Sequence, residues 1–370
     1  MFDALPAPLN SVVPFLIVLG VLVFIHELGH YLAARWRGVH VEAFSIGFGR
    51  AIFSWTDRRG TVWKLAWLPL GGYVKLHGQE KPEDADDATR AAWLSGKTFH
   101  EKSVLSRAIV IAAGPFANFA LAIVLFAGLF AVMGRPVVTS QIGDVVASSA
   151  AAKGGLQVGD VITSIDGMTI TRFEQVREIV GSHPGQALKL HIDRAGQALD
   201  LVVTPDTRVV GGVAVGLLGV RGGATVFEPV STITALGAGV TQTWAVTVQT
   251  FDGVIGMITR RTSSDDMGGP LRIAQMSGQV ASLGLASLVS FIAILSVNLG
   301  LLNLFPIPVL DGGHLVFYAF EALRGRPLPA RAQEYGYRAG FAVLIGLFVF
   351  ATWNDLGHLG LFRWVAGLIG

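Results

Sequence analysis

Long runs of apolar residues divide the chain into segments that can cross a membrane and segments that cannot. A membrane-spanning helix needs about 20 mostly apolar residues to cross a hydrocarbon core roughly 30 Å thick. Four stretches approach or meet that requirement and predict spans, at residues 12–34, 107–133, 284–304 and 339–353. The pattern therefore predicts a polytopic α-helical membrane protein with four transmembrane helices.

A further apolar stretch, residues 229–258, has a different pattern. Its large apolar residues, including Ile233, Val240 and Phe251, recur at helical spacing, while polar residues fall largely elsewhere on the helical wheel. Such an amphipathic pattern favours a helix lying on the membrane surface. The alternative is a fifth span, which would reverse the direction in which residues 284–304 cross the membrane.

The region between the second and third spans has the short strand-like and helical runs that are typical of a soluble domain. Residues 137–204 contain β-type runs around one helical stretch, FEQVREIVGS. The string SSAAAKGGLQVGDVITSIDG resembles the PDZ fold in its circularly permuted bacterial form, which binds a peptide as an added strand. The alternative is a β-rich spacer without a ligand.

These patterns predict four consecutive regions. We expect an N-terminal membrane part at 1–136, a PDZ domain at 137–222, an amphipathic membrane-surface segment at 223–283 and a C-terminal membrane part at 284–370. The fold class is thus an α-helical membrane protein with an inserted α+β PDZ domain.

Composition agrees with a chain that is partly surrounded by lipid. Charged residues make up 15% of the 370 residues and hydrophobic residues 52%, whereas soluble proteins have about 25% charged residues. The net charge is +2 and the basic residues are scattered, so nothing indicates a nucleic-acid partner. The chain has no cysteine, which excludes disulfides and thiolate sites.

Basic residues near the ends of the spans predict the orientation, because lysine and arginine concentrate in cytoplasmic loops. Arg35 and Arg37 follow the first span, and Lys102 and Arg107 precede the second. The loop between the last two spans also carries arginines, namely Arg324, Arg326, Arg331 and Arg338. We therefore expect both loops in the cytoplasm and both termini and the PDZ domain on the periplasmic side. The first stretch lacks a basic region before it, so we expect it to remain as a span.

Two histidines and a glutamate interrupt the first span, in the string FIHELGHYLAA. A charged residue at the bilayer centre costs about 2.5–3.5 kcal/mol, so such residues are functional candidates. His26 and His30 are separated by four residues and share one helix face, while Glu27 lies beside them. This H-E-x-x-H pattern is typical of two zinc ligands and a general base. The alternative is a buried polar cluster that hydrogen-bonds to neighbouring helices.

A catalytic zinc ion usually has a third protein ligand. The candidates in apolar surroundings are Asp252, Asp311, His314, Asp355 and His358. Asp311 is favoured because it follows the third span, where two prolines break the helix and Gly312–Gly313 are expected to let the backbone turn sharply. With four spans, Asp311 also reaches the cytoplasmic depth of His26.

Several motifs together resemble the site-2 protease family of intramembrane metalloproteases, in particular its RseP-type bacterial enzymes. They are HELGH in the first span, GYVKL at 72–76, NLFPIPVLDGG at 303–313 and the inserted PDZ domain. The best-known RseP-type enzymes carry two tandem PDZ domains, whereas this chain has space for one. The resemblance implies a zinc metalloendopeptidase with one Zn²⁺ per chain, bound by His26, His30 and Asp311, with Glu27 as general base.

The resemblance also implies how substrate is held. Residues 44–76 look like the family's membrane-re-entrant β element, whose edge, Gly72, Tyr73, Val74, Lys75 and Leu76, would pair with an unwound substrate. Asn303 would hydrogen-bond to the substrate backbone or the oxyanion, or else pack between helices. Asn118, Asn298 and His314 are interpreted as structural.

The implied partners are the lipid bilayer, peptides at the PDZ domain and single-span membrane substrates, such as anti-sigma factors or remnant signal peptides. The implied location is the bacterial inner membrane, with the active site toward the cytoplasm.

Two other function classes fit less of the chain. A metal or ion transporter usually has repeated halves with paired broken helices, and no such repeat is visible. A PDZ-based membrane scaffold explains residues 137–204 but gives no purpose to His26, Glu27, His30 and Asp311.

Overall fold

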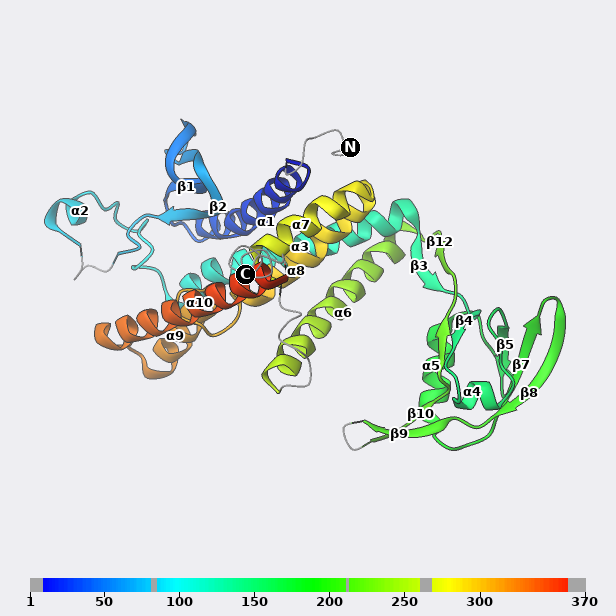
Figure 1. Ribbon diagram of the computed structural model, residues 1–370. Helices are drawn as coiled ribbons and strands as arrows, with labels where there is room; N and C mark the ends of the chain where they lie inside the picture. Colours follow the sequence, from blue (N-terminus) through cyan, green and yellow to red (C-terminus); the bar gives the residue numbers. More distant parts are fainter. Residues whose placement is uncertain (1–8, 81–84, 211–212, 260–267, 359–370) are drawn as a thin grey trace, which may run out of the picture. The chain divides into compact units, whose positions relative to one another are not determined.

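The chain divides into two compact units, which the computed structural model describes at residues 9–80, 85–210, 213–259 and 268–358 (Figure 1). One unit combines residues 1–129 with 236–370 and contains the apolar helices. The other unit is the β-rich segment 130–235.

Four helices of the first unit are long and apolar enough to cross a membrane, which confirms the four-span prediction. They are α1 (Leu9–Trp36), α3 (Val104–Met133), α8 (Leu285–Asn303) and α10 (Ala330–His358). The last helix is much longer than the predicted stretch 339–353. Charged residues ended the apolar run in the sequence, but the helical backbone continues through them.

Small residues bring the membrane helices close together. A Cβ atom on Gly29 of α1 would overlap with the carbonyl oxygen of Ala113 on α3. A Cβ atom on Gly300 of α8 would lie 3.0 Å from the carbonyl oxygen of Pro115. Glycines of this kind allow close backbone approach where helices meet in lipid, and here they press α1 and α8 against α3.

The segment expected to be a loop between the last two spans contains a further helix, α9 (Asp311–Arg324). The expectation that Gly312–Gly313 turn the backbone sharply was wrong, because both lie in the first turn of α9. They are needed for space: a Cβ atom on Gly312 would overlap with the Leu304 carbonyl, and one on Gly313 with that of Ile307. Gly325 ends the helix in the left-handed conformation, at φ 70°.

The stretch predicted as an amphipathic helix forms α6 (Thr232–Ile258) and is not among the four candidate spans of the described residues. Its inner face packs against the spans. A Cβ atom on Gly239 would lie 2.7 Å from the Ile123 carbonyl of α3, and the Thr250 hydroxyl donates to Asn298 of α8 at 2.8 Å. A position on the membrane surface stays a prediction.

Helix α7 (Pro270–Ser282) lies beside α1 and α8 (Figure 1). Its first backbone N–H groups are bound by a buried carboxylate from α10. Asp355 accepts hydrogen bonds from the amides of Gly269, Leu271 and Arg272 at 2.8–3.1 Å. Asp355 therefore caps a helix, which explains this acidic residue without a metal.

Strands β1 (Val41–Thr56) and β2 (Val62–Leu76) form the β element expected at 44–76. The start of β1 pairs on one side with the end of β2, from Val41↔Leu76 to Ile46↔Gly72, and on the other side with the start of β2. The two long strands are therefore folded into a sheet of shorter segments. Entry of this sheet into the membrane stays a prediction.

Glycines make that folding possible and leave one edge free. Gly47, Gly49 and Gly71 have φ of 87°, 86° and 139°, which side chains rarely allow. Residues 72–76 have only β1 as a strand neighbour among the described residues. The other edge of this segment faces α1, which carries the two histidines. Helix α2 (Asp87–Ala91) lies in the connection to α3.

The β-rich unit has the elements expected of a PDZ-like domain. A four-stranded sheet has the order β6-β5-β7-β8, and three more strand pairs and helices α4 and α5 complete it. The elements are β3 (Arg135–Val138), β4 (Ile142–Val145), α4 (Ala150–Lys153), β5 (Val161–Ile165), β6 (Met168–Thr169), α5 (Phe173–Ser182), β7 (Leu188–Arg194), β8 (Gln197–Val203), β9 (Asp206–Val210), β10 (Val213–Leu217), β11 (Val220–Gly222) and β12 (Thr225–Glu228).

Alternating residues of this unit form its core. Leu188, Leu190 and Ile192 of β7 are buried, while the residues between them are exposed. They pack with Val176 and Val180 from α5. Pairing of β12 with β3 continues to residue 228, past the boundary predicted at 222, and the predicted region boundaries stay predictions.

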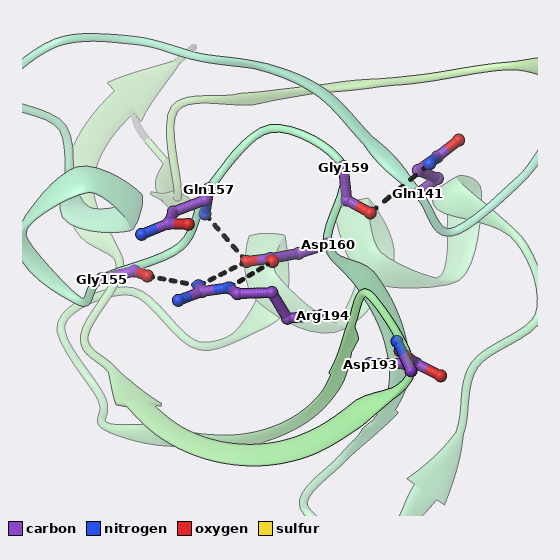
Figure 2. Close-up of polar contacts among 8 residues, drawn as sticks. Gln141, Gly155, Gln157, Gly159, Asp160, Asp193 and Arg194 are labelled. Carbon is purple, nitrogen blue, oxygen red and sulfur yellow. Dashed lines mark hydrogen bonds and ion pairs between the residues drawn. The ribbon is translucent and has the colours of Figure 1, made fainter.

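A buried ion pair fixes the loop between α4 and β5 (Figure 2). Asp160 is 1% exposed, accepts two hydrogen bonds from Arg194 at 2.7 and 2.8 Å, and accepts another from the Gln157 amide. Arg194 also donates to the Gly155 carbonyl. Burial raises the pKa of the Asp160 carboxyl, but these hydrogen bonds outweigh burial and hold the pKa below its ordinary value.

We predict that Asp160→Asn destabilises the β-rich unit by about 2 kcal/mol near neutral pH, because charge-assisted hydrogen bonds are lost. The loss corresponds to a melting temperature roughly 10 °C lower for residues 130–235. A lowered pKa stabilises the fold above the unfolded value of about 3.9, and this stabilisation disappears as pH falls through the folded pKa. The melting temperatures of the wild-type and Asp160→Asn proteins should therefore converge in acid.

The matched control is Asp144→Asn, which removes an exposed partner of Arg221 at 3.8 Å. Exposed pairs contribute about 0–1 kcal/mol, so this melting temperature should hardly change. Equal losses for the two variants would show that the buried pair has no special role.

Candidate active site

Three side chains that are far apart in the sequence converge inside the first unit. His26 Nε2 lies 3.2 Å from Asp311 Oδ2, and His30 Nε2 lies 3.6 Å from the same oxygen. The two imidazole nitrogens are 3.2 Å apart. One ligand atom from each residue lies within 4.8 Å of the others, and no other such group of three was found among the described residues.

Local structure explains how these residues meet. His26 and His30 follow one face of α1, and Asp311 is the first residue of α9. Gly114 on α3 leaves room for the His30 imidazole, with which a Cβ atom there would overlap. Val309, two residues before Asp311, has φ 107°. That conformation is strained for a β-branched residue, and such strain is typical of functional sites.

The cluster has the chemistry of a cation site. Asp311 Oδ2 is buried and has no hydrogen-bond donor among the described residues, although it faces two imidazole nitrogens. A buried carboxylate oxygen that receives no hydrogen bond is costly, and a metal ion would remove that cost. Zinc binds imidazole nitrogen and carboxylate oxygen, so the three side chains fit a zinc ion. Their role as ligands stays a prediction.

Glu27 lies beside the cluster and is in contact with the free edge of β2. A Cβ atom on Gly72 would lie 3.1 Å from Glu27 Cγ and 2.8 Å from Val23 Cγ1. The glycine therefore lets the strand edge approach α1 at the position of the candidate base.

A cavity of about 470 Å³ is open to these groups. Its lining includes the three cluster residues and Glu27, and the predicted substrate-binding residues Gly72, Tyr73, Val74, Leu76 and Asn303. Lys75 does not line the cavity. Its ammonium group instead lies 2.7 Å from Glu42 on β1, so the sequence prediction for Lys75 has no support from the geometry of its side chain.

The other candidates for a third ligand have different surroundings. Asp355 caps α7, and Asp252 is exposed on α6. His314 lines the cavity and its Nδ1 lies 3.3 Å from the Tyr337 hydroxyl. The side chain of His358 lies outside the described residues. The geometry therefore favours Asp311, and His314 is the nearest alternative on the same helix.

Sequence reasoning missed an ion pair and a tyrosine that also line the cavity. Arg107 of α3 pairs with Glu321 of α9 at 2.6 Å, and its guanidinium lies 5.0 Å from the centre of the Tyr318 ring. Asp311, His314, Tyr318 and Glu321 line the same cavity. These four residues follow one another at spacings of three and four, which place side chains on one helix face. That spacing was the signal available in the sequence.

Comparisons with known proteins agree with this chemistry. The family model described as Peptidase family M50 matches residues 14–347. A protein of Rhizobium meliloti (strain 1021) whose name contains the words zinc metalloprotease is 45% identical over 359 residues, covering 93% of this chain and 96% of the relative. Metalloprotease MmpA of Caulobacter vibrioides is 38% identical over 395 residues, covering 97% of this chain and 98% of MmpA.

Two further similarities concern the expected family type and the insert. Regulator of sigma E protease from Salmonella typhi is 34% identical over 447 residues, covering 93% of this chain and 98% of that protein. The PDZ domain of the SdrC-like protein Lin2157 from Listeria innocua is 19% identical, with a TM-score of 0.21, and covers 24% of this chain and 99% of the domain. The chain belongs to peptidase family M50, the site-2 protease family of zinc metalloproteases.

Proposed function

We propose that this multi-pass membrane protein is an intramembrane protease that hydrolyses peptide bonds within the transmembrane segments of single-span membrane proteins. One observation carries the proposal. Two of the three candidate ligands, His26 and His30, and the candidate base Glu27 lie within a helix long and apolar enough to span a membrane, beside the free edge of β2.

Depth supports this assignment. His26 follows Leu9, the first residue of α1, by 17 residues, or roughly 26 Å at 1.5 Å per residue. The cluster would therefore lie within the hydrocarbon thickness but toward the end of α1 that carries Arg35 and is followed by Arg37. With positive residues inside, that end faces the cytoplasm and the PDZ-like unit faces the periplasm of a bacterial inner membrane.

One Zn²⁺ per chain, held by His26, His30 and Asp311, would supply Lewis-acid chemistry that activates water and polarises the substrate carbonyl. Glu27 would accept the proton of the attacking water and pass it to the nitrogen of the leaving amine. Asn303 lines the same cavity, and its side-chain amide would donate a hydrogen bond to the substrate carbonyl as negative charge develops there.

The strand edge would solve a problem specific to helical substrates. Peptide bonds in a helix are shielded by their own hydrogen bonds, and unpaired backbone groups are costly in lipid. An unwound substrate segment that pairs with residues 72–76 would satisfy its backbone and expose one bond beside Glu27. The backbone of Val74, which lines the cavity, would be one of the groups available to that segment.

Specific partners follow from the same proposal. Single-span anti-sigma factors and remnant signal peptides have the single apolar segment that such a site requires. Extended peptides would bind at the PDZ-like unit. Its predicted periplasmic location would suit sensing or selecting substrates before they reach the cavity.

Glu27→Gln should abolish cleavage of a single-span substrate, by at least about 100-fold, because the amide cannot accept a proton. Zinc content should stay at the wild-type level, since Glu27 is not a ligand. The measurement is cleavage of a purified substrate in liposomes, together with elemental analysis. Glu334→Gln, at an exposed position of α10, is the control, and wild-type turnover in Glu27→Gln would refute the mechanism.

Asp311→Ala should lose most of its bound zinc, whereas His314→Ala should keep it. Both residues line the cavity from α9, so the pair separates a ligand from a neighbour. Zinc per chain, measured on protein purified in detergent and checked for folding, gives the answer. Full zinc occupancy in Asp311→Ala together with loss in His314→Ala would assign the third ligand to His314.

Cysteine cross-linking should place substrate on the strand edge. The chain has no native cysteine, so single cysteines at positions 73–76 in the Glu27→Gln background give unambiguous contacts with a trapped substrate, whereas Gly72 has no room for a side chain. Trp67, on β2 and 77% exposed, provides the control position. A bound substrate that cross-links nowhere between 73 and 76 would rule out pairing at this edge.

A further inference from the structure

A buried asparagine on α3 is in contact with one of the candidate ligands. Asn118 is 0% exposed, and its side-chain nitrogen Nδ2 lies 3.2 Å from Nδ1 of His26. This ring nitrogen is opposite to Nε2, which faces Asp311. The backbone carbonyl of Asn118 accepts a hydrogen bond at 2.8 Å from the Ser296 hydroxyl of α8. Asn118 is thus held from one side by α8 and meets His26 on the other.

The side-chain amide leaves one polar atom without a partner. Asn118 Oδ1 is buried and has no hydrogen bond among the described residues. An imidazole that offers Nε2 to a metal carries its proton on Nδ1 and needs an acceptor there. Rotation of the amide by 180° exchanges its nitrogen and oxygen in nearly the same volume. That rotation would place Oδ1 against the Nδ1–H of His26.

The second histidine already has this arrangement. His30 Nδ1 lies 2.9 Å from the backbone carbonyl oxygen of Val110, also on α3. Pro115, between Val110 and Asn118, has no N–H group for the carbonyl of Ile111, which weakens the hydrogen-bond ladder of the helix in this region. The contacts of Val110 and Asn118 place helix α3 along both imidazoles, on the side away from Asp311.

We propose that Asn118 is a positioning residue for the metal centre: its amide oxygen accepts the Nδ1–H of His26 and thereby fixes the Nε2 lone pair toward the cation site that His26 shares with His30 and Asp311. The inference rests on the zinc site of the proposed function and adds a residue to it. Helix α3 then supplies an oxygen acceptor to each histidine, a backbone carbonyl for His30 and a side chain for His26. The role does not require contact with substrate.

Zinc affinity tests this role without measuring cleavage. Asn118→Leu keeps the size of the side chain and removes the acceptor, so zinc affinity measured by chelator competition should fall about 10–100-fold. Asn118→Asp restores an oxygen acceptor and should return the affinity to within a few-fold of wild type. Asn298→Leu is the matched control, because that asparagine binds Thr250 and not a histidine, and its zinc affinity should not change.

Two results would overturn the proposal. One is wild-type zinc affinity in folded Asn118→Leu protein, and the other is an equal loss in Asn118→Leu and Asn118→Asp, which would indicate a packing role. Neither result would contradict the proposal that the wild-type protein is a protease. Conversely, absence of proteolysis with normal zinc binding would refute the proposed function alone.

A spectrum of the unsubstituted protein decides the matter if Asn118→Leu does not fold. In zinc-loaded protein labelled with ¹⁵N-histidine, the His26 ring should show a protonated Nδ1 and a coordinated Nε2. The His26 signals are assigned by their absence from the spectrum of His26→Ala. A protonated Nε2 with a coordinated Nδ1 would contradict the proposal.

Discussion

The first unit is organised around one buried carboxylate oxygen. Asp311 Oδ2 has no hydrogen-bond donor among the described residues and faces two imidazoles inside a group of apolar helices. A buried carboxylate oxygen that receives no hydrogen bond is costly. A bound cation removes that cost, and α1 and α9 then become two sides of one coordination site. Gly114 on α3 leaves room for the His30 imidazole, and Gly312 and Gly313 of α9 pack against the carbonyls of Leu304 and Ile307, so these glycines serve the same arrangement.

The position of Glu27 on α1 also explains where the β element lies. Gly72 lets the edge of β2 reach α1 beside Glu27, and the positive φ angles of Gly47, Gly49 and Gly71 allow the two long strands to fold into shorter segments. A free strand edge is unfavourable unless something pairs with it. An unwound substrate would be such a partner, and it would place its backbone where the base and the cation site already are.

Much of this could be predicted from sequence because the signals are local. Long apolar runs predicted four spans, and the spacing of His26, Glu27 and His30 placed them on one side of a single helix. The β-type runs within residues 137–204 predicted strands, and β7 is one of them. Asp311 was chosen from several candidates with the help of chain direction and of the family resemblance.

The rest depends on contacts between residues far apart in the chain, which leave no periodic pattern. Arg107 meets Glu321 across 214 residues, and Asn118 meets His26 across 92. The role of Asp355 as a cap became visible only with α7 in place. Gly312 and Gly313 were misread for a related reason: glycine signals either a turn or close packing, and only the neighbouring carbonyls decide between them.

X-ray absorption spectroscopy of the zinc-loaded wild-type protein tests the central claim most directly, because it reports which atoms bind the metal. The account predicts two imidazole nitrogens and a carboxylate oxygen at about 2.0–2.2 Å, with an additional light-atom ligand from water. Multiple scattering from imidazole rings makes their number measurable. A site with three imidazoles, or with fewer than two, would contradict a centre built from His26, His30 and Asp311.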